Sequence, residues 1–173
     1  MAFSGVDLCT MRKYMLLIAL VGLGFSARSQ SSGFGLGIML GDPTGLNGKL
    51  WLNGDRALDF GLAWGIYGRY VHLHSDYLFH NMELLHVSAG KLALYYGPGL
   101  RIRSWTGGRY WDHGRWEDYD GSRIGVGVRF PVGLDYMFDG IPVDVFLEVV
   151  PSLDLLPSTY FDLDAAIGGR FWF

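Results

Sequence analysis

Apolar and polar residues alternate along most of the chain, and the last fifteen residues show this pattern most clearly. Counting back from Phe173, every second residue is apolar or small, with aromatic side chains at both ends of the set. The residues between them carry every charge of the segment. Successive side chains of a β-strand point to opposite faces. The segment 159–173 is therefore predicted to be a strand with one apolar and one charged face.

The same alternation predicts seven earlier strands, which are separated by residues that favour turns. Asn53-Gly54 is the strongest turn signal, because Asn-Gly is preferred in short hairpins. Beyond the amino-terminal segment, no stretch predicts a helix of useful length. The eight predicted strands cover 33–41, 46–52, 57–66, 70–80, 91–103, 123–138, 143–153 and 159–173.

The apolar face of the last strand has aromatic residues at its two ends, which is typical of strands that cross a bilayer. An unpaired backbone amide in hydrocarbon costs several kcal/mol, so such a sheet has to close on itself. The pattern therefore predicts an all-β fold, an eight-stranded antiparallel up-and-down transmembrane β-barrel. We expect apolar side chains outside and charged side chains inside. Eight strands leave an interior that side chains fill, without an aqueous channel.

The amino terminus has the layout of a secretory signal peptide. A basic start at 11–13 precedes an apolar run over 14–23, which is shorter than the roughly 20 residues of a spanning helix. Small and polar residues follow, and we expect cleavage before Gln30. A buried amino-terminal helix is the alternative. The predicted divisions are a non-native or mis-assigned start over 1–10, a signal peptide over 11–29 and the barrel over 30–173.

Composition agrees with a β-rich protein in contact with a membrane. Hydrophobic residues make up 50% of the 173 residues and aromatic ones 16%, and there are 26 glycines. Only 18% are charged, against roughly 25% in soluble proteins. A net charge of -3 without a basic run argues against nucleic-acid binding. The single cysteine, Cys9, precedes the apolar run, which argues against a lipoprotein anchor, and no internal disulfide can form.

The charged faces of the strands would meet inside the barrel and have to pair there or be hydrated. Lys91 and Arg103 are placed on this inner face by their spacing, beside a larger predicted network. Its members are Lys49, Asp59, His72, His74, Asp76, Arg101, Arg129, Asp135, Asp144, Glu148, Asp162, Asp164 and Arg170.

An even strand count returns both termini to one side of the membrane, which we place in the periplasm. The longest connector, 104–122, then lies outside the cell, as is usual for such barrels. Aromatic residues gather at the predicted rims, as in membrane barrels generally. Those at the periplasmic rim are Phe79, Tyr136, Phe138, Phe171 and Phe173, and those at the outer rim are Trp64, Tyr67 and Phe161.

Together, the signal peptide, the eight strands and the terminal Phe resemble the small outer-membrane barrels of the OmpA/OmpX type. Four segments are more similar to a little-characterised barrel family first described from spirochaetes. These segments are Gly-Leu-Gly-Ile-Met-Leu-Gly-Asp-Pro-Thr-Gly-Leu (35–46), Val-His-Leu-His-Ser-Asp-Tyr-Leu-Phe-His (71–80), Leu-Tyr-Tyr-Gly-Pro-Gly (94–99) and Asp-Val-Phe-Leu-Glu-Val-Val-Pro (144–151). The resemblance implies a monomeric barrel in the outer membrane of a Gram-negative cell envelope, inserted by the barrel-assembly machinery through Phe173. It implies no catalytic residue, metal or cofactor.

Two sets of residues are candidates for chemistry or binding. His72, His74 and Asp76 share one face at a spacing of two, as metal ligands or a base with its acid would. Because no nucleophile or further metal ligand accompanies them, we favour a part of the inner charge network and predict no enzyme. The long connector is rich in residues that dominate interfaces and is a candidate partner-binding loop. Its candidate contacts are Trp105, Arg109, Tyr110, Trp111, Arg115 and Trp116.

Three functions remain open from the sequence. The favoured one is a structural or surface-adhesion barrel that contacts outer-membrane lipid and an unknown extracellular partner. The second is a lipid-modifying enzyme that uses His72, His74 or Asp76. The third is a soluble secreted barrel of the lipocalin type, which would have an apolar interior in place of the charged one predicted here.

Overall fold

The computed structural model describes residues 32–64, 70–85, 87, 90–112 and 115–173. Within 83–85, 106–112 and 115–122 it describes the backbone alone. The start and signal peptide predicted over 1–29 lie outside the described residues. None of the described residues forms a helix long and apolar enough to cross a membrane.

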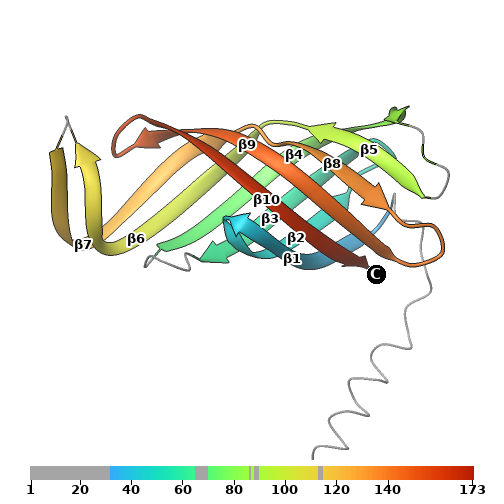
Figure 1. The fold of residues 1–173 in the computed structure, drawn as a ribbon, viewed down its shortest axis with the longest axis horizontal. Helices are drawn as coiled ribbons and strands as arrows, with labels where there is room; N and C mark the ends of the chain where they lie inside the picture. Colours follow the sequence, from blue (N-terminus) through green and yellow to red (C-terminus); the bar gives the residue numbers. More distant parts are fainter. Residues whose placement is uncertain (1–31, 65–69, 86, 88–89, 113–114) are drawn as a thin grey trace, which may run out of the picture.

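The described part of the chain is built from antiparallel strands (Figure 1). Outward leucines, valines and isoleucines alternate with inward polar or small residues, which favours half-buried strands over helices. Their bounds are β1 Phe34–Asp42, β2 Thr44–Trp51, β3 Arg56–Trp64, β4 Tyr70–Leu85, β5 Lys91–Tyr96, β6 Gly99–Asp112, β7 Arg115–Arg129, β8 Val132–Met137, β9 Val143–Leu156 and β10 Tyr160–Trp172.

The sheet closes because the first and last strands pair with each other. Gly35 of β1 lies opposite Trp172 of β10, and the pairing continues to Asp42 opposite Ala165. β10 also pairs with β9 along nearly its whole length. The predicted all-β, antiparallel, up-and-down barrel is therefore confirmed.

Two predicted strands are interrupted near their middles. The segment 91–103 divides into β5 and β6 at Gly97-Pro98, and 123–138 divides into β7 and β8 at Phe130-Pro131. A proline has no N–H to donate to the ladder, which explains both breaks. Each broken strand still crosses the barrel once, because its two halves share a neighbour: β5 and β6 both pair with β4, and β7 and β8 both pair with β9. The ten strands thus make eight crossings.

The three longest predicted connectors are wrong in part, because the strands continue into them. β4 extends to Leu85, and β9 extends to Leu156, where loops were expected over 81–90 and 154–158. The expected loop 104–122 is a ribbon in which β6 and β7 stay paired as far as Asp112 opposite Arg115. Figure 1 shows this ribbon extending past one end of the barrel. The connector predicted over 67–69 lies outside the described residues.

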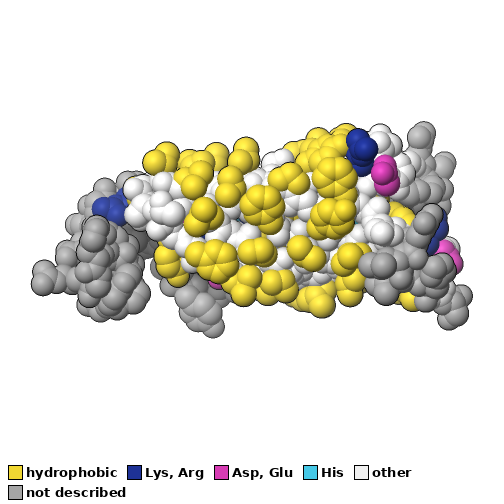
Figure 2. Space-filling model, turned by 90° about the horizontal axis from the view of Figure 1, so that it is seen from above, with side chains coloured by type: hydrophobic (Ala, Val, Ile, Leu, Met, Phe, Trp, Pro, Cys, Tyr) yellow, Lys and Arg dark blue, Asp and Glu magenta, His cyan; other side chains and the backbone are white. Residues whose placement is uncertain are grey.

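The outer surface of the barrel is apolar. Large apolar side chains from all ten strands, mostly leucine, valine, isoleucine and phenylalanine, are exposed; Leu100 and Leu163, for example, are each 62% exposed. Figure 2 shows these hydrophobic side chains gathered along the barrel, with charged side chains near its ends. A soluble monomer rarely exposes a continuous apolar patch beyond a few hundred Å².

Paired aromatic side chains surround the end of the barrel that holds the carboxyl terminus. Tyr136 and Phe138 have ring centroids 4.7 Å apart, and Phe171 and Phe173 have theirs 5.2 Å apart. Phe79 stacks on Tyr96 at 6.0 Å. Trp64 and Phe161 lie exposed at the opposite end, whereas Tyr67 lies outside the described residues.

Candidate functional site

The interior of the barrel holds the charged side chains. Of the thirteen residues predicted for the inner network, twelve are buried, and Asp162 is half-buried. Lys91 was wrongly placed inside; it is exposed, because it lies at the first position of β5, at the barrel rim. The predicted network left out further buried polar side chains of the same interior, among them Asn47, His80, Tyr95, Ser152 and Asp154.

Arg170 of β10 is the centre of the most connected group. Its Nε donates to Asp144 Oδ1 at 2.9 Å, and its Nη2 donates to Asp135 Oδ2 at 3.1 Å. Its Nη1 donates to Asp59 Oδ2 at 2.9 Å and to Asn47 Oδ1 at 3.1 Å. One guanidinium thereby joins β2, β3, β8, β9 and β10. Its planar array of donors suits such a role, which an ammonium could not fill.

Lys49 pairs with one carboxylate of this group and lies beside a buried apolar cluster. Its ammonium donates to Asp135 Oδ2 at 2.5 Å, and neither side chain is exposed. The same ammonium lies 4.9 Å from the centre of the Trp51 ring. Trp51 packs with Trp172 and Met137 in a buried apolar cluster, at the strand ends nearest the carboxyl terminus. This cluster lies inside the barrel at that end.

A second group of ion pairs lies toward the β6–β7 ribbon. Arg101 is fully buried, and its Nε donates to Asp154 Oδ1 at 2.8 Å while its Nη1 donates to Asp164 Oδ2 at 2.9 Å. Arg103 donates to Asp162 Oδ2 at 2.9 Å and also to Asp154. Asp154 was predicted to lie in a connector, yet it bridges both arginines because β9 continues past it.

Between the two groups, Arg129 lies near two carboxylates. Its Nη2 donates to Glu148 Oε1 at 3.3 Å, and its Nε lies 3.4 Å from Asp76 Oδ1 without forming a hydrogen bond. The Tyr95 hydroxyl donates to Glu148 Oε2 at 2.8 Å. Glu148 is therefore well satisfied, whereas Asp76 is not.

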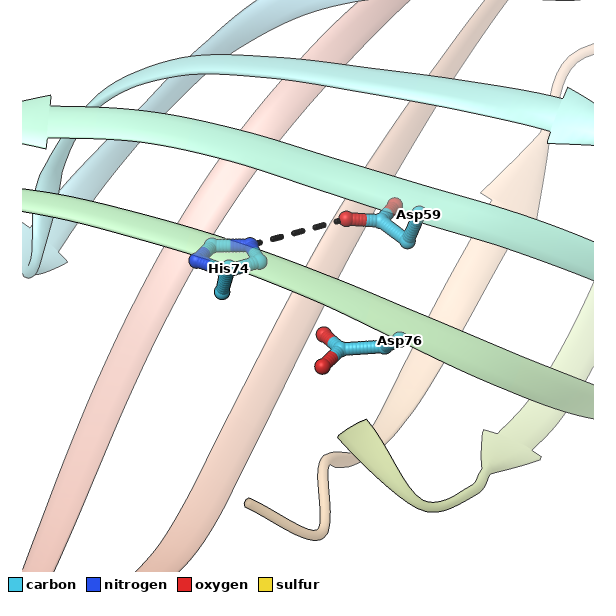
Figure 3. A group of neighbouring side chains, drawn as sticks. All are labelled: Asp59, His74 and Asp76. Atoms are coloured by element: carbon cyan, nitrogen blue, oxygen red, sulfur yellow. Dashed lines mark ion pairs between the residues drawn. The ribbon is translucent and has the colours of Figure 1, made fainter. Parts of the chain in front are cut away.

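Asp59, His74 and Asp76 form a compact cluster in this middle region (Figure 3). A possible ligand atom from each residue lies within 4.8 Å of those of the other two. His74 Nε2 is 3.7 Å from Asp59 Oδ1, which is too long for a hydrogen bond. Both ring nitrogens of His74 lack a hydrogen-bond partner among the described residues, and so does Asp76 Oδ1.

The buried interior carries more negative than positive groups. In the described part of the chain, seven carboxylates are buried but only four lysine or arginine side chains. The half-buried Arg103 and Asp162 add one charge of each sign and pair with each other. Buried charges are costly unless they are paired, so this excess of carboxylates has to be met by protons or by bound cations.

His72, His74 and Asp76 were the sequence candidates for catalysis. All three are buried, with His72 and His74 ring centroids 5.3 Å apart. They face the interior of the barrel, on the opposite side of the wall from the apolar surface. A lipid held at that surface cannot touch them.

The candidate partner-binding residues of 104–122 divide into two sets. Trp105 is half-buried and belongs to the inner face, because its ring lies 5.3 Å from the Arg103 guanidinium. This corrects its assignment to an exposed loop. The side chains of Arg109, Tyr110, Trp111, Arg115 and Trp116 lie outside the described residues, although their backbone is part of the ribbon.

Comparison with known sequences and structures gives one family and two similar barrels. A family described as protein of unknown function (DUF3996) matches residues 25–166. The N-terminal β-barrel domain of Pseudomonas aeruginosa OprF is 16% identical, with 81% of this chain and 94% of that chain covered and a TM-score of 0.49. Ail, the attachment invasion locus protein of Yersinia pestis, is 14% identical, with 82% and 94% covered and a TM-score of 0.36. No curated protein matches the sequence.

Proposed function

Because the chain belongs to the DUF3996 family of proteins of unknown function, whose description names no activity, we propose a function from the barrel itself. The protein is an integral barrel of the bacterial outer membrane with a side-chain-filled interior. Its role is structural or adhesive, and the β6–β7 ribbon is its contact surface outside the cell.

The observation that carries this proposal is the arrangement of the two faces of the wall. Apolar side chains cover the outside, and the ion pairs of Arg170 and Arg101 occupy the inside. A soluble barrel that holds an apolar ligand would need the reverse arrangement. A closed barrel leaves no strand edge in hydrocarbon, so all its ladder hydrogen bonds are made within the protein.

The interior supports a structural role over a porin-like channel. The buried apolar cluster around Trp51 and Trp172 lies at one end, and buried ion pairs occupy the middle. Eight-stranded barrels have just enough interior for their own side chains. Every carboxylate or guanidinium moved aside to open a path would lose its partners.

Assembly and oligomeric state belong to the same proposal. Phe173 follows the last strand and packs edge-on against Phe171 at the rim, a position that supports its recognition by the barrel-assembly machinery. A closed barrel satisfies its own backbone without a second copy, which supports a monomer surrounded by lipid.

We expect Leu147→Arg to reveal whether the outer face contacts lipid. Leu147 is 54% exposed on β9, between Leu134 of β8 and Ile167 of β10. In a bilayer, arginine near the midplane of a barrel wall costs about 2–4 kcal/mol of folding free energy. On a surface that faces water, the same substitution changes the unfolding free energy by only about ±0.5 kcal/mol. Urea unfolding of the barrel in phospholipid vesicles measures the difference.

The control is Gly54→Arg, which adds the same side chain in an exposed turn where a Cβ has nothing within 4 Å. It should leave the unfolding free energy unchanged. If Leu147→Arg behaves like this control, the outer face does not contact lipid and the proposal fails.

Replacing residues 106–121 with a short turn should separate the ribbon from the barrel. We expect the shortened protein to reach the outer membrane and keep a heat-shifted band in detergent. The β6–β7 pairs from Gly99 opposite Arg129 to Trp105 opposite Arg123 are retained. Adhesion of cells that carry it to cultured epithelial cells should fall about tenfold or more, to the level of cells that lack the protein. Binding equal to that of the full-length protein would show that the ribbon is not the contact surface.

A further inference from the structure

We propose that Asp59, His74 and Asp76 bind one divalent transition-metal ion, of which Zn²⁺ is the representative, inside the barrel. This site is additional to the proposed structural or adhesive role and does not depend on where the barrel resides. It replaces the sequence interpretation in which His72 stood beside His74 and Asp76.

The spacing of the three side chains fits a small ion. Zinc bonds of about 2.0–2.1 Å at tetrahedral angles place neighbouring ligand atoms roughly 3.3 Å apart. The observed 3.7 Å between His74 Nε2 and Asp59 Oδ1 is too long for a hydrogen bond and close to that value. Figure 3 shows Asp76 on the strand of His74, with its carboxylate beside the other two groups. Small side-chain rotations would bring all three ligand atoms onto one ion.

Two glycines make room for the cluster. Gly61 lies opposite His74 in the β3–β4 ladder, and a Cβ there would lie 2.1 Å from His74 Cε1. Gly99 lies opposite Asp76 in the β4–β6 ladder, and its Cβ would lie 1.7 Å from Asp76 Oδ1. The absence of a side chain at both glycines therefore leaves the space that His74 and Asp76 occupy.

The cluster has unused lone pairs in a buried place. His74 and Asp76 are 6% and 2% exposed, and Asp76 Oδ1 and both His74 nitrogens have no hydrogen-bond partner among the described residues. Leaving such groups unsatisfied in a buried place is costly. A metal ion would use the lone pairs of one ring nitrogen and of the Asp76 oxygen.

The surrounding groups orient Asp59 and favour a cation. Asp59 Oδ1 accepts a hydrogen bond from Asn47 Nδ2 at 2.6 Å, and Asp59 Oδ2 accepts one from Arg170 at 2.9 Å. Such outer partners position metal-binding carboxylates. The buried excess of carboxylates over lysines and arginines supplies the negative charge that a divalent ion needs.

The donor set decides the class of ion. One imidazole and two carboxylates suit zinc and its first-row neighbours, whereas Ca²⁺ and Mg²⁺ prefer six or more oxygen ligands. Three protein ligands leave a fourth position for water. Arg129 is the opposing feature, because its Nε lies 3.4 Å from Asp76 Oδ1. The competing possibility is that Asp76 is only the partner of this arginine.

The test is calorimetric titration of the folded, tag-free barrel in detergent with ZnCl₂, after treatment with a chelator. We expect one equivalent to bind, with CaCl₂ and MgCl₂ giving no comparable heat. His74→Ala should weaken zinc binding at least about 100-fold, since loss of an outer-sphere partner alone costs about 10–100-fold. The matched control, His80→Ala, removes an equally buried histidine outside the cluster and should keep the wild-type affinity.

A measurement on the unaltered protein decides the question if the variant does not fold. X-ray absorption at the zinc edge should show one imidazole with oxygen ligands. Any of three results would overturn the site in favour of the Asp76–Arg129 pair: the wild-type barrel binds no zinc, His74→Ala binds zinc as tightly as the wild type, or the zinc ligands include no imidazole.

Discussion

Arg170→Met is expected to destabilise the folded barrel by about 3–5 kcal/mol, the cost of breaking a buried ion pair from one side. The substitution keeps most of the length and apolar volume of the side chain but removes all its donors. Asp59, Asp135 and Asp144 would each lose the guanidinium within 3.1 Å of one of their oxygens. Lys49 would remain for Asp135, but among the side chains that the structure describes, only the Trp172 indole would still donate to Asp144.

The effect should be read from urea unfolding in vesicles, with Arg56→Met as the matched control. Arg56 is exposed and lies 3.9 Å from an exposed Asp55, and such surface pairs contribute about 0–1 kcal/mol. A similar small change for both variants would mean that Arg170 does not hold the interior together. Arg170→Lys should rescue only part of the loss, because three donors on one nitrogen cannot reach carboxylates from three strands.

The period of the side-chain pattern is what made the barrel predictable. In Val143–Leu156, alternation alone separates the outward Leu147 from the inward Glu148, and burial follows it. The rule depends only on backbone geometry, so it holds without any knowledge of partners. It places a residue on a face of the wall, and it does not say which residue of the next strand lies beside it.

The register between neighbouring strands could therefore not be predicted from the sequence. The cluster of Asp59 with His74 and Asp76 crosses from β3 to β4, where Asp59 lies opposite Asp76. A shift of one residue in the pairing would reverse which side chains meet. The sequence grouped His72 with His74 and Asp76 because they share one strand, and it had no means of adding Asp59.

Strand ends were missed for a different reason. The β6–β7 ribbon extends past the end of the barrel (Figure 1), and its polar residues suggest a loop. Asp154 was missed although it is buried inside the barrel. It comes just after the predicted strand 143–153, and its position is fixed by ion pairs with Arg101 and Arg103 of β6. Contacts between distant strands settle what local composition leaves open.

Gly37→Val is expected to prevent closure of the barrel, with a loss of stability of about 3 kcal/mol or more, at the upper end of the range for overpacked sites. Gly37 lies opposite Arg170 across the seam between β1 and β10. A Cβ at this position would come 1.8 Å from the Gly169 carbonyl oxygen and 2.7 Å from the Arg170 Cα. Both are backbone atoms, so relief requires the two strands to separate. Separation would break the only ladder that joins the ends of the described sheet and expose unpaired amides to lipid.

The measurement is the fraction of protein that shows a heat-shifted band after insertion into vesicles, which should fall to near zero. Gly54→Val is the control, because the same side chain meets no atom within 4 Å there. A heat-shifted fraction for Gly37→Val equal to that of the control would show that the seam can widen, and that close contact between β1 and β10 is not what closes the barrel.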